Sequence, residues 1–102
     1  MKKVFISQPM GGKTDDEILS ERKNAIELIK NTLHDDVEIL DSFFDFAPPV
    51  PTEARPLWCL GESLKVMSVA DVVYFCHGWE NARGCKIEHE CALRYGIQTI
   101  ID

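Results

Sequence analysis

The stretch DVVYFC at residues 71–76 decides the fold, because it is a nearly continuous apolar run with one charge at its start. A strand with one exposed face alternates apolar and polar residues, whereas a strand inside a parallel sheet is covered on both faces. The run therefore predicts a buried parallel strand. Shorter apolar segments at residues 2–7, 37–40 and 97–101 predict three further strands.

Helices are predicted between these strands. Thr14 and Glu17 have the spacing of a capping box, which places a helix start there. That helix continues to about residue 33 along an apolar stripe formed by Ile18, Ala25, Ile29 and Leu33. Two more helices are expected, from Leu57 to about Ala70 and from about residue 85 to Tyr95.

Alternating strands and helices predict one α/β domain spanning residues 1–102. We expect a doubly wound, flavodoxin- or Rossmann-like parallel sheet of four to five strands with flanking helices. Right-handed crossovers favour the strand order 2-1-3-4. Residues 42–56 interrupt the pattern with three phenylalanines and four prolines, which predicts an irregular lid, binding loop or contact with another subunit.

Composition excludes several classes of protein. A net charge of -6 argues against nucleic-acid binding, which needs a basic surface. No segment approaches the ~18 apolar residues of a membrane span, so no membrane partner is expected. The four cysteines form no CxxC pair, which favours a cytoplasmic location and argues against a disulfide framework. A chain of 102 residues buries a limited core, so a homodimer or higher homo-oligomer is expected.

Two unusual loops follow the first and third predicted strands, at residues 8–13 and 77–84. Parallel strands of this order bind ligands at the carboxyl edge of the sheet, between these two strands. The loops and their flanks therefore supply the predicted substrate-binding residues: Ser7, Gln8, Met10, Gly11, Gly12, Lys13, Trp79, Asn81, Arg83 and Gly84. We expect no cofactor.

Glu88 is the candidate catalytic carboxylate. It follows the second loop near the start of a helix, whose dipole favours the ionised form. A positioned carboxylate can attack an anomeric carbon, although glutamate near a helix start is also ordinary capping chemistry. Glu80, in the loop itself, is a rival. Asp71, at the start of the third strand, can be read as a simple boundary residue.

The two loops also raise questions of ligand charge and stacking. Backbone amides of Gly11 and Gly12 can hold a phosphate, but residues 15–17 are acidic, so Lys13 or Arg83 would have to supply the cation. Trp79 can stack on a base or pack on the surface.

Cys85 and His89, spaced i,i+4, raise the alternative of a metal site. Structural zinc ligands have tighter, repeated spacings, so no metal is expected. A thiol nucleophile at Cys85 would gain from the helix start, but no His–Asn or His–Asp partner is evident.

Three segments together resemble a known family: VFISQPMGGK at residues 4–13, ADVVY at 70–74, and GCKIE at 84–88. The chain resembles the nucleoside 2-deoxyribosyltransferase superfamily, in particular its short phage and bacterial members, and is related to the deoxynucleoside 5'-monophosphate N-glycosidases. The resemblance covers nearly the whole chain and implies a nucleoside deoxyribosyltransferase-like domain that binds a nucleoside or nucleotide.

The resemblance implies that Glu88 attacks C1' of a deoxyribosyl group and forms a glycosyl ester, which a second base or water then resolves with retention. It implies that Asp71 assists catalysis, and that Ser7, Gly11 and Gly12 line the sugar or 5' pocket. The chain departs from the family pattern where Val4 replaces a tyrosine, Met10 an arginine and Ala82 a serine. The missing tyrosine favours an alternative function, a non-catalytic nucleotide-sensing module with the same fold.

Overall fold

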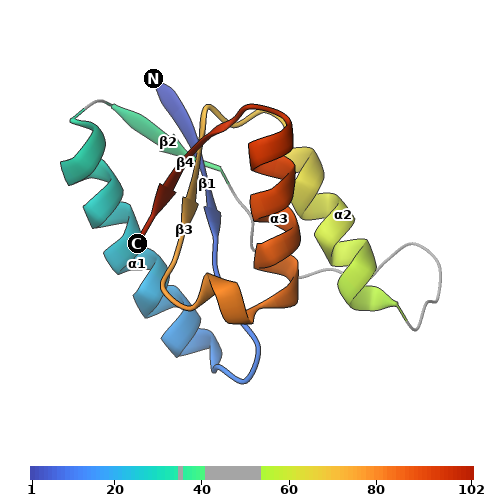
Figure 1. Ribbon diagram of the computed structural model, residues 1–102. Coiled ribbons are helices and arrows are strands. Elements are labelled where there is room, and N and C mark those ends of the chain that lie inside the picture. The colour runs from blue at the N-terminus through green and yellow to red at the C-terminus, as the bar shows by residue number, and fades with distance from the viewer. Residues whose placement is uncertain (35, 41–53) are drawn as a thin grey trace.

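The computed structural model describes residues 1–34, 36–40 and 54–102 as a four-stranded sheet with helices on both faces (Figure 1). The elements in chain order are β1 (Lys2–Ser7), α1 (Asp15–Leu33), β2 (Val37–Ile39), α2 (Arg55–Met67), β3 (Val72–Phe75), the short 3-10 helix η1 (Trp79–Asn81), α3 (Arg83–Arg94) and β4 (Gln98–Ile101). The strands are all parallel in the order β2-β1-β3-β4, which confirms the predicted fold class and strand order. No helix within the described ranges is long and apolar enough to cross a membrane.

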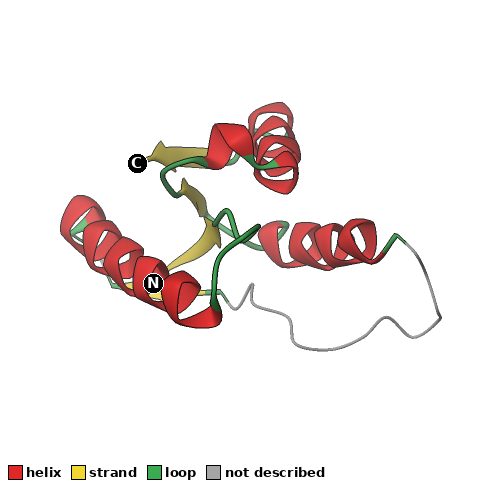
Figure 2. Cartoon of the chain, turned by 90° about the horizontal axis from the view of Figure 1, so that it is seen from below, coloured by secondary structure: helices red, strands yellow, loops and turns green. Residues whose placement is uncertain are grey.

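The core has two layers, because successive residues of the central strands point to opposite faces of the sheet. Val4, Ile6, Val72 and Tyr74 pack with Ala25 and Ile29 of α1 on one face. Phe5, Val73 and Phe75 pack with Met67 of α2 and Ala92 of α3 on the other face. Figure 2, seen from below, shows α1 alone on its side of the sheet and α2 with α3 on the opposite side.

Local sequence signals account for the helix ends. The predicted capping box is formed at the start of α1, where the backbone N–H of Glu17 donates to Thr14 Oγ1 (3.2 Å) and that of Thr14 donates to Glu17 Oε1 (3.3 Å). The helix ends at Leu33, and His34, which caps it, has the left-handed conformation (φ 54°).

The start of α2 corrects one prediction. The proline-rich segment 42–56 was expected to be irregular throughout, but α2 already begins at Arg55 and includes Pro56 in its first turn. Proline is tolerated there because the first N–H groups of a helix have no acceptor inside the helix. The phenylalanines at positions 43, 44 and 46 and the predicted lid or subunit contact lie outside the described residues.

The register of the central strands separates the two edges of the sheet. Ser7 pairs with Phe75 at the carboxyl edge, where the chain turns towards α1 and η1. At the amino edge, the backbone N–H of Asp71 donates to the Lys3 carbonyl, and the backbone N–H of Lys3 donates to Asp71 Oδ2. Glu88 and Asp71 therefore belong to opposite edges of the sheet.

Candidate active site

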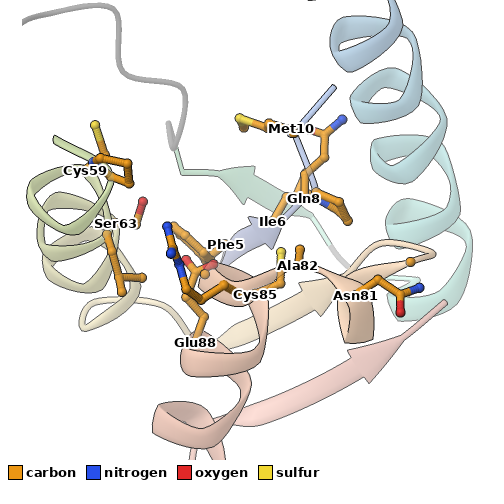
Figure 3. A pocket seen from close by; sticks show the side chains of 17 residues that line it. Phe5, Ile6, Gln8, Met10, Cys59, Ser63, Asn81, Ala82, Cys85 and Glu88 are labelled. Atoms are coloured by element: carbon orange, nitrogen blue, oxygen red, sulfur yellow. The ribbon is translucent and has the colours of Figure 1, made fainter. Parts of the chain in front are cut away.

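A cavity of about 690 Å³ lies at the carboxyl edge of the sheet (Figure 3). Cys59 and Ser63 of α2 form one wall, and Gln8 and Met10 of the segment after β1 lie on the opposite side. The start of α3 closes the cavity between them. Seven of the predicted site residues line it: Gln8, Met10, Gly11, Asn81, Arg83, Gly84 and Glu88.

Glu88 is the carboxylate of this cavity. It lies in the second turn of α3 and is only 6% exposed. Ser7, at the last position of β1 and 1% exposed, donates a hydrogen bond from Oγ to Glu88 Oε1 at 2.9 Å. The described residues that line the cavity include no second carboxylate and one cation, Arg83.

Burial and hydrogen bonding act on Glu88 in opposite directions. Removing a carboxylate from water penalises the charged form, and this raises the pKa of Glu88 to about 7. The hydrogen bond from Ser7 favours the charged form and limits the rise. Both the protonated and the ionised form of Glu88 are therefore populated near neutral pH.

Gln8 is the second polar group buried at the cavity, at 6% exposure. Its Nε2 donates to the carbonyl oxygen of Ile18 in α1 at 2.7 Å. Its Oε1 is buried and has no hydrogen-bond partner among the described residues. A buried polar atom without a partner costs about 1–3 kcal/mol of stability, so such atoms are uncommon in folded proteins.

The glycine loop does not present a cation to the cavity. Gly12 adopts a left-handed conformation (φ 76°), which lets the chain turn from β1 into α1. Lys13 then points to α1, where its Nζ lies 2.8 Å from Glu21 Oε2 and lowers the pKa of that carboxyl. Lys13 and Glu21 line a separate cavity of about 250 Å³ beside α1.

Trp79 does not line the cavity either. The centroid of its ring lies 4.3 Å from that of the His89 ring, at an interplanar angle of 30°, and 5.4 Å from that of the Phe75 ring. The side chain of Trp79 therefore packs against other side chains and is not placed to stack on a ligand in the cavity. Its indole nitrogen is buried without a hydrogen-bond partner among the described residues.

Asp71 was predicted to assist catalysis, but the structure does not bring it to the cavity. Its Oδ2 accepts a hydrogen bond from the backbone N–H of Lys3 at 2.8 Å, and its own N–H donates to the Lys3 carbonyl. Asp71 precedes Phe75, the carboxyl-end residue of β3, by four positions, which is about 13 Å of extended strand. A match within one strand does not say which end of the strand faces the ligand.

The position that the family resemblance matched to a tyrosine, Val4, does not line the cavity. Val4 is fully buried on the face of the sheet that α1 covers. The next residue, Phe5, points to the other face and lines the cavity with Glu88. An aromatic ring is therefore present at the cavity, although it has no hydroxyl group.

Sequence reasoning missed the wall that α2 provides. Pro56, Cys59, Leu60 and Ser63 recur at helical spacing and all line the cavity. This i,i+3/i+4 pattern predicts a helix face, but it does not say that the face covers a ligand site rather than the core. Phe5, Ile6, Pro9, Gly78, Ala82 and Cys85 complete the lining.

The metal and thiol alternatives gain no support from the geometry. The described residues contain no group of three or more His, Cys, Asp or Glu side chains placed to hold a metal ion. Cys85 lines the cavity, but burial raises the pKa of its thiol, which keeps it protonated at neutral pH.

Comparison of the chain with protein-family models, curated proteins and solved structures finds no match. A functional interpretation therefore rests on the cavity and on the sequence resemblance given above.

Proposed function

We propose that the chain cleaves or transfers the N-glycosidic bond of a 2'-deoxynucleoside or its 5'-monophosphate, with Glu88 as the nucleophile. One observation carries the proposal: a buried carboxylate on the wall of a ligand-sized cavity, held by a hydrogen bond from Ser7. The order of the loop and helix segments also resembles that of the nucleoside 2-deoxyribosyltransferases.

The reaction follows from the orientation of this carboxylate. The Ser7 hydroxyl donates a hydrogen bond to Oε1 of Glu88, so Oε2 is the oxygen that attacks C1' of the sugar. The C1'–N bond breaks, and the base leaves with its electron pair and takes a proton from water. A glycosyl ester on Glu88 remains. Water or a second base then attacks C1' and releases the carboxylate, with net retention at C1'.

The cavity suits a small ligand of this kind. Its volume of about 690 Å³ lies within the range of ordinary ligand sites, and its lining combines apolar side chains with a few polar groups. We place the reaction in the cytoplasm, consistent with the four cysteines being free thiols. We also propose that the protein acts as a homo-oligomer, as the small core favours.

A non-catalytic nucleotide-binding module is the second candidate, and the raised pKa of Glu88 favours it. A carboxyl group with a pKa of about 7 is protonated in roughly half of the molecules at neutral pH. The protonated form is a poor nucleophile, but it can donate a hydrogen bond to a bound base or sugar.

Incubation with a panel of 2'-deoxynucleosides and their 5'-monophosphates separates the two functions. The enzyme releases free base, and Glu88→Gln abolishes the release while Glu90→Gln does not. Glu90 is a matched control because it lies on the same helix, exposed and paired with Arg94. Binding without base release by the wild type would instead support the binding module.

A further inference from the structure

Arg83 is the cation of the cavity lining that the structure describes, and no described ion pair uses its charge. It is the first residue of α3 and is exposed. The ion pairs formed among the described residues involve Lys13, Lys65 and Arg94, but not Arg83. A guanidinium offers five N–H donors in a planar arrangement that matches the oxygens of a phosphate or carboxylate. Arg83 can therefore bind an anionic group of a ligand.

The sequence offered two cations to an anionic ligand, Lys13 and Arg83, and the structure separates them. The ammonium group of Lys13 lies 2.8 Å from Glu21 Oε2, and both residues line the second cavity, beside α1. Arg83 lines the larger cavity together with Glu88. Among the described residues, Arg83 is therefore the side chain that can pair with an anion at the site of Glu88.

The distribution of charge in the larger cavity matches a ligand with one anionic group. Glu88 is the one carboxylate of the described lining, and burial keeps part of its population protonated near neutral pH. Arg83 precedes Glu88 by five positions, which is about 7.5 Å along the helix axis. This separation leaves room for a sugar between the carboxylate that attacks C1' and the guanidinium. The anionic group of the ligand then lies away from the reacting carbon.

The stereochemistry of the proposed reaction indicates where on the sugar this group is attached. Glu88 attacks C1' from the face opposite the base. In a 2'-deoxynucleoside the 3'-oxygen lies on the attacked face of the sugar, whereas the 5'-carbon lies on the same face as the base. A 3'-phosphate would therefore be on the side of the attacking carboxylate, and the two like charges would repel. A 5'-phosphate avoids this repulsion.

We propose that Arg83 determines specificity: its guanidinium binds the 5'-phosphate of a 2'-deoxynucleoside 5'-monophosphate. The site then takes 5'-monophosphates in preference to nucleosides and to 3'-monophosphates. Two N–H groups of one guanidinium can donate to two phosphate oxygens, and such charge-assisted hydrogen bonds are stronger than neutral ones. This inference rests on the proposed function, because the position of the phosphate is deduced from the attack of Glu88 on C1'.

Calorimetry with a 2'-deoxynucleoside and its 5'-monophosphate tests the binding. The Glu88→Gln protein is used, because it prevents turnover and retains an oxygen that can accept from Ser7. The monophosphate is expected to bind about tenfold more tightly than the nucleoside, as for one charge-assisted hydrogen bond. Added salt should weaken the binding of the monophosphate and not that of the nucleoside. Equal or tighter binding of the nucleoside would overturn the proposal.

Rates of base release by the wild type test the position of the phosphate. The 5'-monophosphate is expected to have a kcat/KM about tenfold higher than that of the nucleoside or of the 3'-monophosphate. A 3'-monophosphate that reacts as fast as its 5' isomer would contradict the assignment of Arg83 to the 5'-phosphate.

The substitution Arg83→Gln, in the Glu88→Gln protein, provides the matching change in the chain. It should weaken binding of the 5'-monophosphate about tenfold and leave binding of the nucleoside unchanged. Lys86→Gln is the matched control, because Lys86 is an exposed cation of the same helix that does not line the cavity. It removes the same charge and should preserve the preference for the monophosphate. An equal loss in both variants would show that the overall charge of the protein attracts the phosphate, and would overturn the proposal.

Failure of the proposed function gives a different result. If the wild type releases no base, but binds the 5'-monophosphate in a manner that depends on Arg83, the enzymatic function is refuted and the phosphate contact stands. If base release from the 5'-monophosphate is the same in the wild type and in Arg83→Gln, the role of Arg83 is refuted and the enzymatic function stands.

Discussion

Two carboxylates at opposite edges of one sheet have different surroundings in this fold. Glu88 lies at the carboxyl edge, is nearly fully buried and accepts a hydrogen bond from the side chain of Ser7. Asp71 lies at the amino edge, is exposed and accepts from the backbone N–H of Lys3. The first carboxylate faces a cavity, and the second completes the hydrogen bonding between two strands.

The difference follows from the geometry of parallel sheets. Loops and helix starts gather at the carboxyl edge, so groups carried by separate segments meet there. At the amino edge, a strand begins with backbone groups that need partners, and a short acidic side chain can supply one. Burial also raises the pKa of Glu88 to about 7.

The largest expected effect is on turnover. Glu88→Gln should lower kcat for base release by about a thousandfold or more, since it removes the proposed nucleophile. Asp71→Asn keeps an oxygen for the Lys3 N–H and should leave kcat/KM within about twofold. Steady-state rates on the best substrate measure both. If Asp71→Asn lowered the rate of base release as much as Glu88→Gln does, the proposed functional difference between the two edges of the sheet would be contradicted.

A smaller but substantial effect is expected on stability. Because the folded state holds Glu88 with a pKa raised from 4.5 to about 7, its ionisation opposes folding. Stability should therefore fall as pH rises through this window and then level off above it. The cost at full ionisation is about 3 kcal/mol, and Glu88→Gln avoids it.

Urea unfolding of the wild type and of Glu88→Gln, at about pH 4 and about pH 8, measures this effect. The variant should gain about 3 kcal/mol relative to the wild type on going from the lower to the higher pH. A pH-independent difference between Glu88→Gln and the wild type would mean that Glu88 is not desolvated in the folded protein.

Ser7→Ala sharpens the comparison with a more modest change. It removes the hydrogen bond that favours ionised Glu88, so the pKa of Glu88 should rise further and the rising limb of the pH–rate profile should move to higher pH. The rate at neutral pH should fall about three- to tenfold and recover in alkaline buffer. Ser20→Ala, at an exposed position of α1, is the matched control. An unshifted pH–rate profile in Ser7→Ala would show that Ser7 does not influence the ionisation of Glu88.

Much of the fold was predictable because its signals are local. The apolar run at 71–76 predicted β3, and the Thr14–Glu17 capping box predicted the start of α1. The alternation of elements predicted a parallel sheet, and right-handed crossovers predicted its strand order. The start of α2 was misplaced, since proline forbids a helix interior but not its first turn.

The site was predictable only in part, because it depends on contacts between distant segments. The place of Glu88 at the carboxyl edge followed from topology alone. The hydrogen bond between Ser7 and Glu88 joins residues 81 positions apart, and no local sequence pattern predicts it. Likewise, the spacing of Cys59 and Ser63 indicated a helix face without showing that it borders the cavity.

The central claim is that Glu88 carries the glycosyl group, and trapping that intermediate tests it most directly. A 2'-deoxy-2'-fluoro-arabinosyl nucleoside slows hydrolysis of the ester, because the fluorine destabilises the oxocarbenium-like transition state. Mass spectrometry of the intact protein should show the mass of one fluoroglycosyl group per chain, and peptide analysis should locate it on Glu88. Base release from the ordinary substrate with no adduct from the fluorinated one, or an adduct on another residue, would contradict the account.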